Sequence, residues 1–177
     1  MHPDLLIRPL EHAHLPAVLA IQLRCYDDSK QEAAAAFASK LDGAPDTSFL
    51  AQIGEDAVGY LVAVPVEGSS PLPLNDRAYR RPAMPGALYL HDLAVHPDAR
   101  RYGVAAALIA AYWAALHRLG LGVGCLTAVD GSAPFWQRHG FQETALDGEA
   151  SALLAAYGPG TRFMSRVLPG PGSRRAR

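Results

Sequence analysis

The chain contains two kinds of hydrophobic pattern. Short apolar segments bounded by turn-forming residues predict β-strands, and apolar residues that recur every three to four positions predict amphipathic helices. The segments SFLAQI (48–53) and AVGYLVAV (57–64) are separated by three residues that include a glycine, which predicts a β-hairpin. The expected strands are 4–8, 48–53, 57–64, 87–95, 123–129, one from Phe141 onward and 161–168, and the expected helices are 11–25, 29–41, 103–119 and 132–139.

Capping residues indicate where these helices begin and end. Ser29 followed by Glu32 has the spacing of a capping box, so we expect the second helix to begin there. Gly120 follows the long helix and predicts its end, and Ser132 predicts the start of the short helix. Strands and helices alternate without a linker, so we expect one α/β domain with a mixed sheet over residues 1–168.

Residues 65–86 interrupt this pattern with five prolines. A segment of this length inside a compact domain either belongs to a functional site or is a plain insertion. Its leucines and Tyr79 suit an apolar or aromatic ligand, whereas its three arginines suit an acidic one. Both alternatives stay open at the level of the sequence.

Composition and charge argue against several classes of function. Half of the 177 residues are hydrophobic, enough for a core, but no run approaches the roughly 18 apolar residues of a membrane span. The first twelve residues lack a basic stretch followed by an apolar one, so we expect no signal peptide and a cytoplasmic protein. Residues 1–168 carry thirteen basic and seventeen acidic side chains, which disfavours nucleic acid as a ligand. We expect residues 169–177, with three arginines, to be a disordered tail.

Cysteines and histidines give little indication of chemistry by their spacing. Cys25 and Cys125 are far apart in the chain, and we interpret them as two reduced thiols, with a disulfide as the alternative. No pair of histidines has the spacing of metal ligands, so we expect no metal.

The segment HDLAVHPDARRYGVAAALI (91–109) joins an expected strand to the long helix. The first N–H groups of a helix lack partners and, with the helix dipole, bind anions. Arg100 and Arg101 add positive charge, while Gly103 and Ala105 leave room for a phosphate near the backbone. The segment has neither the Lys of a Walker loop nor the glycines of a dinucleotide fingerprint. It predicts a pyrophosphate site, or else a solvated arginine turn before a core helix.

Two motifs resemble those of the GNAT acetyltransferases. Residues 100–105 (RRYGVA) are similar to the family's acyl-CoA pyrophosphate motif, Q/R-x-x-G-x-G/A, and residues 133–141 (APFWQRHGF) to its A-x-x-F-Y-x-x-x-G-F segment. The order of the expected elements agrees as well. The resemblance implies a GNAT-like α/β domain, with a mixed, mostly antiparallel central sheet flanked by helices, that acts with acetyl-CoA.

The resemblance also implies where acetyl-CoA binds. The cosubstrate is expected in a splay between the strands 88–95 and 123–129. The residues implied in its binding are Leu93 and Val95 for the pantetheine arm, Arg100, Arg101, Tyr102, Gly103, Val104, Ala105 and Ala106 for the pyrophosphate, and Phe135 of the short helix.

An acetyl transfer to an alkylamine needs a base, because the amine is mostly protonated at neutral pH. Many family members have a Glu at the position of His91, and residues 91–96 resemble the arylalkylamine N-acetyltransferases, which have a catalytic His there. Histidine titrates near neutrality. Strand alternation predicts that His91, Leu93 and Val95 share one face and that Asp92 lies on the other. Asp92 is the second candidate, and a structural His91 with satisfied nitrogens is the alternative.

Two positions depart from the family pattern. Trp136 replaces the Tyr that many members use to protonate the CoA thiolate, and an indole cannot supply that proton. Either the thiolate leaves unprotonated, or Tyr157 or Tyr60 supplies the proton, or the chain binds acyl-CoA without turnover. Asp130 replaces an Asn that contacts the cofactor in many members of the family. Because a carboxylate repels phosphate, we do not assign this role to Asp130.

The sequence thus predicts an acetyl-CoA-dependent N-acetyltransferase that moves an acetyl group to the primary amine of a small molecule by direct attack. The alternatives are a peptide or protein amino group as acceptor, a non-catalytic acyl-CoA sensor, and an interaction protein that uses residues 65–86. By resemblance, the helices 11–25 and 29–41 form the acceptor pocket. Homodimers are common in the family, and no residue here indicates one.

Overall fold

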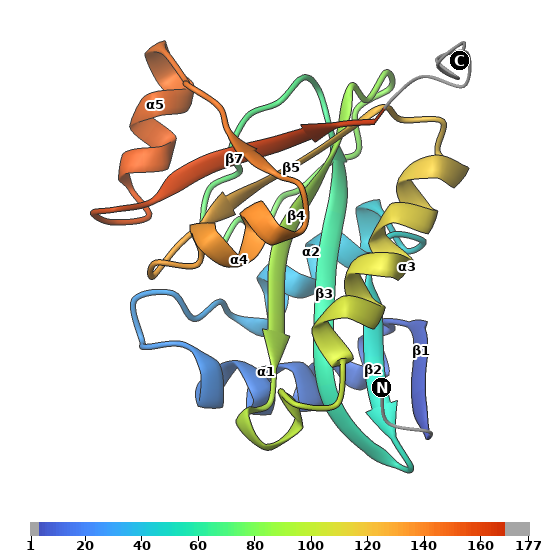
Figure 1. Cartoon of the computed structure of the whole chain (residues 1–177). Coiled ribbons are helices and arrows are strands. Elements are labelled where there is room, and N and C mark those ends of the chain that lie inside the picture. Colours follow the sequence, from blue (N-terminus) through green and yellow to red (C-terminus); the bar gives the residue numbers. More distant parts are fainter. Residues whose placement is uncertain (1–3, 169–177) are drawn as a thin grey trace, which may run out of the picture.

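A computed structural model describes residues 4–168 (Figure 1). One seven-stranded sheet has the order β1-β2-β3-β4-β5-β7-β6, and every neighbouring pair is antiparallel except β4 with β5. The strands are β1 (Leu5–Pro9), β2 (Phe49–Ile53), β3 (Asp56–Val66), β4 (Ala87–Val95), β5 (Val123–Ala128), β6 (Gln142–Glu143) and β7 (Arg162–Val167). The mixed, mostly antiparallel α/β fold is confirmed. The expected tail, 169–177, lies outside the described residues.

Helices cover both faces of the sheet (Figure 1). They are α1 (Leu15–Cys25), α2 (Ala34–Gly43), α3 (Val104–Arg118), α4 (Ala133–Arg138) and α5 (Gly148–Ala155), with 3₁₀ turns η1 (His12–His14) and η2 (Pro97–Ala99). On β3, Leu61 packs into the core beneath α3, and Tyr60 packs into the core beneath α1 and α2. Because the strand is buried on both faces, it appears in the sequence as a nearly continuous apolar run.

Most expected elements are present within one or two residues, and two expectations about the helices are wrong. Ser29 and Glu32 do not form a capping box: Ser29 bonds to the side chain of Asp27, and α2 begins only at Ala34. Helix α5 was not expected, because it buries none of its residues and so shows no apolar face.

A β-bulge in β4 changes which side chains face which layer. The pairing with β3 passes from Leu90 directly to Asp92, so His91 is an extra residue in the strand. Beyond it, Leu93 packs against the core beneath α3, whereas Asp92 bonds to Tyr26 at the end of α1. The expected alternation is therefore wrong: His91 and Asp92 both lie on the α1–α2 side, and Leu93 lies on the α3 side.

Candidate functional site

A cavity of about 590 Å³ opens where β4 and β5 diverge. The two strands pair only over Leu88–Leu90 and Gly124–Leu126, and Figure 1 shows β5 turning away from β4 beyond this point. Both strands, the segment between α1 and α2, the start of α3, and α4 contribute to its walls. The expected splay is present, and among the implied site residues it brings together His91, Asp92, Leu93, Val95, Arg100, Ala105 and Phe135.

Backbone groups of β4 face this gap. His96 N–H donates to the carbonyl of Val58 on β3 at 2.9 Å, and bonded and non-bonded pairs alternate along an antiparallel ladder. The backbone N–H and carbonyl groups of Leu93 and Val95 therefore point away from β3. Their carbonyl groups accept bonds from the Tyr26 hydroxyl (3.1 Å) and the Cys25 thiol (3.3 Å), respectively. Their N–H groups are directed at the cavity, where an amide-bearing ligand arm can pair with them.

The arginine turn, residues 97–105, forms the other end of the cavity. Gly103 is the N-cap of α3 and has a left-handed backbone, with φ 79°, a conformation that favours glycine. The first N–H groups of α3 have no acceptor within the helix. Arg100 lines the cavity and bonds through Nε to the Val95 carbonyl at 3.4 Å. This combination of free donors, helix dipole and guanidinium suits a phosphate group.

The other residues of the expected pyrophosphate motif do not line the cavity. Arg101 and Tyr102 are exposed on the turn, and the side chain of Val104 is buried in the core, which leaves only its backbone for a ligand. Ala106 faces a second hollow, between α3 and α4.

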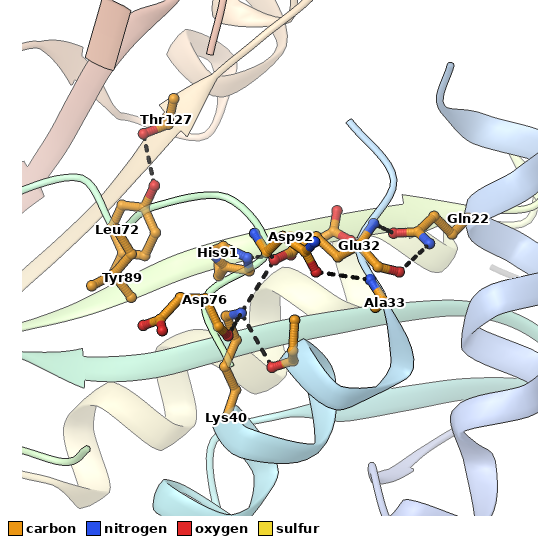
Figure 2. Close-up of polar contacts among 12 residues, drawn as sticks. Gln22, Glu32, Ala33, Lys40, Leu72, Asp76, Tyr89, His91, Asp92 and Thr127 are labelled. Carbon is orange, nitrogen blue, oxygen red and sulfur yellow. Dashed lines mark hydrogen bonds and ion pairs between the residues drawn. The ribbon is translucent and has the colours of Figure 1, made fainter. Parts of the chain in front are cut away.

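Three segments contact the carboxylate of Glu32, and a fourth holds its main chain; Figure 2 shows His91, Lys40 and Gln22 around it. His91 Nε2 bonds to Oε1, while Lys40 Nζ and the N–H of Asn75 approach Oε2 at 3.3 and 2.5 Å. The side chain of Gln22 bonds to both main-chain groups of Glu32. We call Glu32, Lys40, Asn75 and His91 the Glu32 cluster. Its titratable side chains are 3 % (Glu32), 0 % (Lys40) and 1 % (His91) exposed.

The charge state of Glu32 follows from these contacts. Burial alone would raise the pKa of its carboxyl group, but the hydrogen bond of His91, its positive charge when the ring is protonated, and the contacts of Lys40 and Asn75 outweigh burial and lower the pKa to about 2. Glu32 is therefore ionised at neutral pH. A carboxylate only accepts hydrogen bonds, so its contact with His91 requires a proton on Nε2.

Asp92 is held by tyrosines instead of cations. Its two carboxylate oxygens accept bonds from the hydroxyls of Tyr26 (2.7 Å) and Tyr60 (2.6 Å). Burial raises the pKa of Asp92, and burial beside this carboxyl group also raises the pKa of both tyrosines. Within residues 4–168 no salt bridge reaches Asp92, so tyrosine hydroxyls, and not cations, hold this carboxyl group beside His91.

The candidate proton donors are all engaged or unsuited. Trp136 lines the cavity but is 7 % exposed and packs edge-on against Phe135 and Phe141. The Tyr157 hydroxyl donates to the Leu72 carbonyl, and burial beside other titratable groups raises its pKa. The Tyr60 hydroxyl donates to Asp92.

Two further parts of the cavity wall come from outside β4 and α3. Lys30, between α1 and α2, forms an ion pair with Asp130 after β5 at 3.0 Å, and both line the cavity. Leu74 of the proline-rich segment also lines it. The segment is thus part of the cavity wall, and Asp130 pairs with a lysine.

Sequence reasoning missed Glu32, Lys40 and Asn75 as site residues. Glu32 was assigned to a helix cap, and its partner His91 is 59 positions away. One signal was present: Lys40 is a charged residue on the face of α2 that also holds Phe37 and Leu41, which are buried. A charge on an apolar helix face implies a buried partner.

Cys25 and Cys125 are both free thiols. No cluster of three His, Cys, Asp or Glu side chains suited to a metal is found within residues 4–168. In the same part of the chain, no helix is long and apolar enough to cross a bilayer.

Comparison with known proteins agrees with this geometry. The acetyltransferase (GNAT) family matches residues 15–141. Solved structures with the same fold include Ard1 from Thermoplasma volcanium, with 16 % identity, 94 % of this chain and 99 % of that chain covered, and a TM-score of 0.70. A mutant agmatine N-acetyltransferase has 16 % identity, 93 % and 100 % coverage, and a TM-score of 0.67. The NatC complex bound to Gag peptide and CoA has 15 % identity, 94 % and 99 % coverage, and a TM-score of 0.67.

A comparison with curated sequences gives no match. At these identities the structures establish the fold, and the family match covers most of the chain, including both motifs and the strands that enclose the cavity. The chain therefore belongs to the acetyltransferase (GNAT) family and is an N-acetyltransferase that acts with acetyl-CoA.

Proposed function

We propose that the protein transfers an acetyl group from acetyl-CoA to the primary amine of a small molecule, with His91 as the general base. The observation that carries the proposal is one cavity that contains both His91 and the start of α3. Bound acetyl-CoA supplies the acetyl group as an activated thioester.

The residues present fit acetyl-CoA. Arg100 and the free N–H groups at the start of α3, preceded by Gly103, suit the pyrophosphate. The N–H groups of Leu93 and Val95 suit the amides of the pantetheine arm. Phe135 supplies an apolar surface on α4.

The chain's own groups then support direct transfer. The acceptor nitrogen forms a bond to the acetyl carbon, the bond from that carbon to sulfur breaks, and His91 takes the proton that the nitrogen loses. Because Trp136, Tyr60 and Tyr157 offer no suitable proton, the sulfur leaves as a thiolate, whose pKa of about 8 to 9 makes it a fair leaving group.

A small, cationic acceptor fits the side of the cavity formed by Asp92 and the segment between α1 and α2. The carboxyl group of Asp92 has no salt-bridge partner within residues 4–168, so a cationic acceptor that binds beside it would supply one. The ion pair of Lys30 with Asp130 closes this side, which favours a compact acceptor over an extended peptide. The acceptor of agmatine N-acetyltransferase, a fold neighbour, belongs to this chemical class.

The test has two stages. Thermal unfolding is measured with and without acetyl-CoA for the wild type and for Arg101→Glu. A ligand at a hundred times its dissociation constant stabilises the fold by about 2.7 kcal/mol; we expect this shift in the wild type and a smaller one in the variant. CoA release is then measured with alkylamines, arylamines and short peptides.

Turnover of alkylamines alone supports the proposal. Turnover of peptides alone moves the acceptor to a peptide amino group, and the absence of any thermal shift at millimolar acetyl-CoA contradicts the assigned cosubstrate site.

A further inference from the structure

We propose that Glu32 is a positioning residue that fixes the tautomer of His91, with the proton on Nε2 and with Nδ1 left as the nitrogen that accepts the proton of the acceptor amine. The role of Nδ1 rests on the proposed function. The tautomer itself is a property of the protein without substrates, so the two are tested separately.

The contact of His91 with Glu32 sets the tautomer. If Nε2 were unprotonated, it and the carboxylate oxygen would be two hydrogen-bond acceptors facing each other, so Nε2 must carry the proton. In the neutral ring the remaining nitrogen, Nδ1, is then an acceptor. Within residues 4–168, Nδ1 of His91 is the one buried side-chain nitrogen or oxygen atom without a hydrogen-bond partner. An unpaired buried acceptor is costly, and it belongs to a residue that lines the cavity.

Lys40 and Asn75 determine which oxygen His91 meets. Both donate to Oε2 of Glu32, which leaves Oε1 for Nε2 of His91. The main chain of Glu32 is fixed by Gln22. The carboxylate therefore has one orientation, and it can offset the positive charge that His91 acquires when it takes a proton. Asp92 is the other charged group beside His91, and the nearby tyrosine hydroxyls of Tyr26 and Tyr60 donate to Asp92.

This arrangement makes a specific prediction for Glu32→Gln, which keeps the shape of the side chain. A Gln amide has one oxygen and one NH₂ group. Lys40 and Asn75 both need an acceptor, so the oxygen turns toward them and the NH₂ group faces His91. The NH₂ group then donates to Nε2, which must be unprotonated, and the proton moves to Nδ1. The substitution thus reverses the tautomer.

The experiment is ¹⁵N NMR of protein labelled at histidine, recorded over a pH series that reaches the neutral ring. The chain has seven histidines, and His91→Gln identifies the signals of His91. We expect protonated Nε2 and unprotonated Nδ1 in the wild type, and the reverse in Glu32→Gln. Glu55→Gln, in the exposed hairpin turn, is the matched control and leaves the His91 signals unchanged. A wild-type proton on Nδ1, or an unchanged pattern in Glu32→Gln, overturns the proposal.

Lys40→Met keeps the experiment decisive if Glu32→Gln does not fold. It retains the carboxylate and the Asn75 bond, so we expect the wild-type tautomer, and a reversed tautomer contradicts the proposal. In the transfer assay we expect kcat of Glu32→Gln to fall about 100-fold, the low end of a base contribution, with an unchanged KM for acetyl-CoA. Normal kcat with a reversed tautomer overturns the role of Nδ1. If no amine is acetylated at all, the proposed function fails while the NMR result still decides the tautomer.

Discussion

The Glu32 cluster and the arginine turn occupy the two ends of one cavity and are built in opposite ways. The side chains of Glu32, Lys40 and His91 are buried, and hydrogen bonds from four other parts of the chain hold Glu32. The turn is continuous in sequence, Arg100 and Arg101 are exposed on it, and its donors are backbone groups at a helix start. A reactive proton needs fixed geometry, whereas a flexible, highly charged phosphate arm needs charge and access. We therefore expect substitutions in the cluster to affect turnover and stability, and those in the turn to affect acetyl-CoA binding.

The largest expected effect is on turnover in His91→Gln. Removal of a general base lowers kcat by about 10² to 10⁴, while the thermal shift caused by acetyl-CoA stays as in the wild type, because the arginine turn is intact. His139→Gln, at the end of α4, is the control and retains full kcat. A loss of the acetyl-CoA shift in His91→Gln would show that the two ends are not separable.

The next effect is on stability in Lys40→Met. Removing one partner of a buried ion pair costs about 3 kcal/mol, measured as the free energy of unfolding in urea. The matching change in the turn, Arg101→Met, should stay within about 0.5 kcal/mol because Arg101 is exposed. Equal losses in the two variants would contradict the contrast between a buried and an exposed end.

Low pH should destabilise the Glu32 cluster before it affects the arginine turn. The pKa of Glu32 is about 2 in the folded protein against an ordinary 4.5. A lowered pKa stabilises the fold above the ordinary value, and this contribution, up to about 3 kcal/mol, is lost as the pH falls from about 4.5 toward 2. The free energy of unfolding, measured in urea between pH 6 and pH 2.5, should fall less for Glu32→Gln than for the wild type. Glu55→Gln should follow the wild type, and a parallel loss in all three would remove Glu32 from this role.

The smallest expected effect is the backbone strain in Gly103→Ala. Alanine in a left-handed conformation costs about 1 to 2 kcal/mol, and it also disturbs the N–H groups at the start of α3. Gly54→Ala carries the same type of strain, with φ 62°, in the β2–β3 turn. Both variants should lose stability, but only Gly103→Ala should also lose the acetyl-CoA shift. Retention of the full shift in Gly103→Ala would exclude a close approach of the ligand there.

The contrast also explains what could be predicted from the sequence. The arginine turn is local: Arg100, Gly103 and the helix that follows are neighbours in the chain, so a short motif predicts the whole arrangement. The hairpin of β2 and β3 was predictable for the same reason. The sheet order, with β7 inserted between β5 and β6, was not predicted; the resemblance to a known family implied only a mixed, mostly antiparallel sheet.

The Glu32 cluster was not predictable in this way. Glu32 meets Asn75 and His91 across 43 and 59 positions, and local rules assigned it to a helix cap. The expected face of His91 was also wrong, because a bulge is a property of two paired strands and not of the spacing within one. Long-range contacts and register irregularities thus account for the errors at the site.

The bulge has a consequence for how the chain tolerates insertions and deletions. His91 has no pairing partner on β3, because its neighbours Leu90 and Asp92 pair with two consecutive residues of β3, Ala63 and Val62. A deletion of His91 would leave every remaining pair between β3 and β4 in register, and a regular ladder would replace the bulge. The residues that pair in the sheet are thus different from the residue that carries the reactive side chain. A lineage can therefore gain or lose the imidazole by insertion or deletion of one codon, and the other residues of β4 keep their partners.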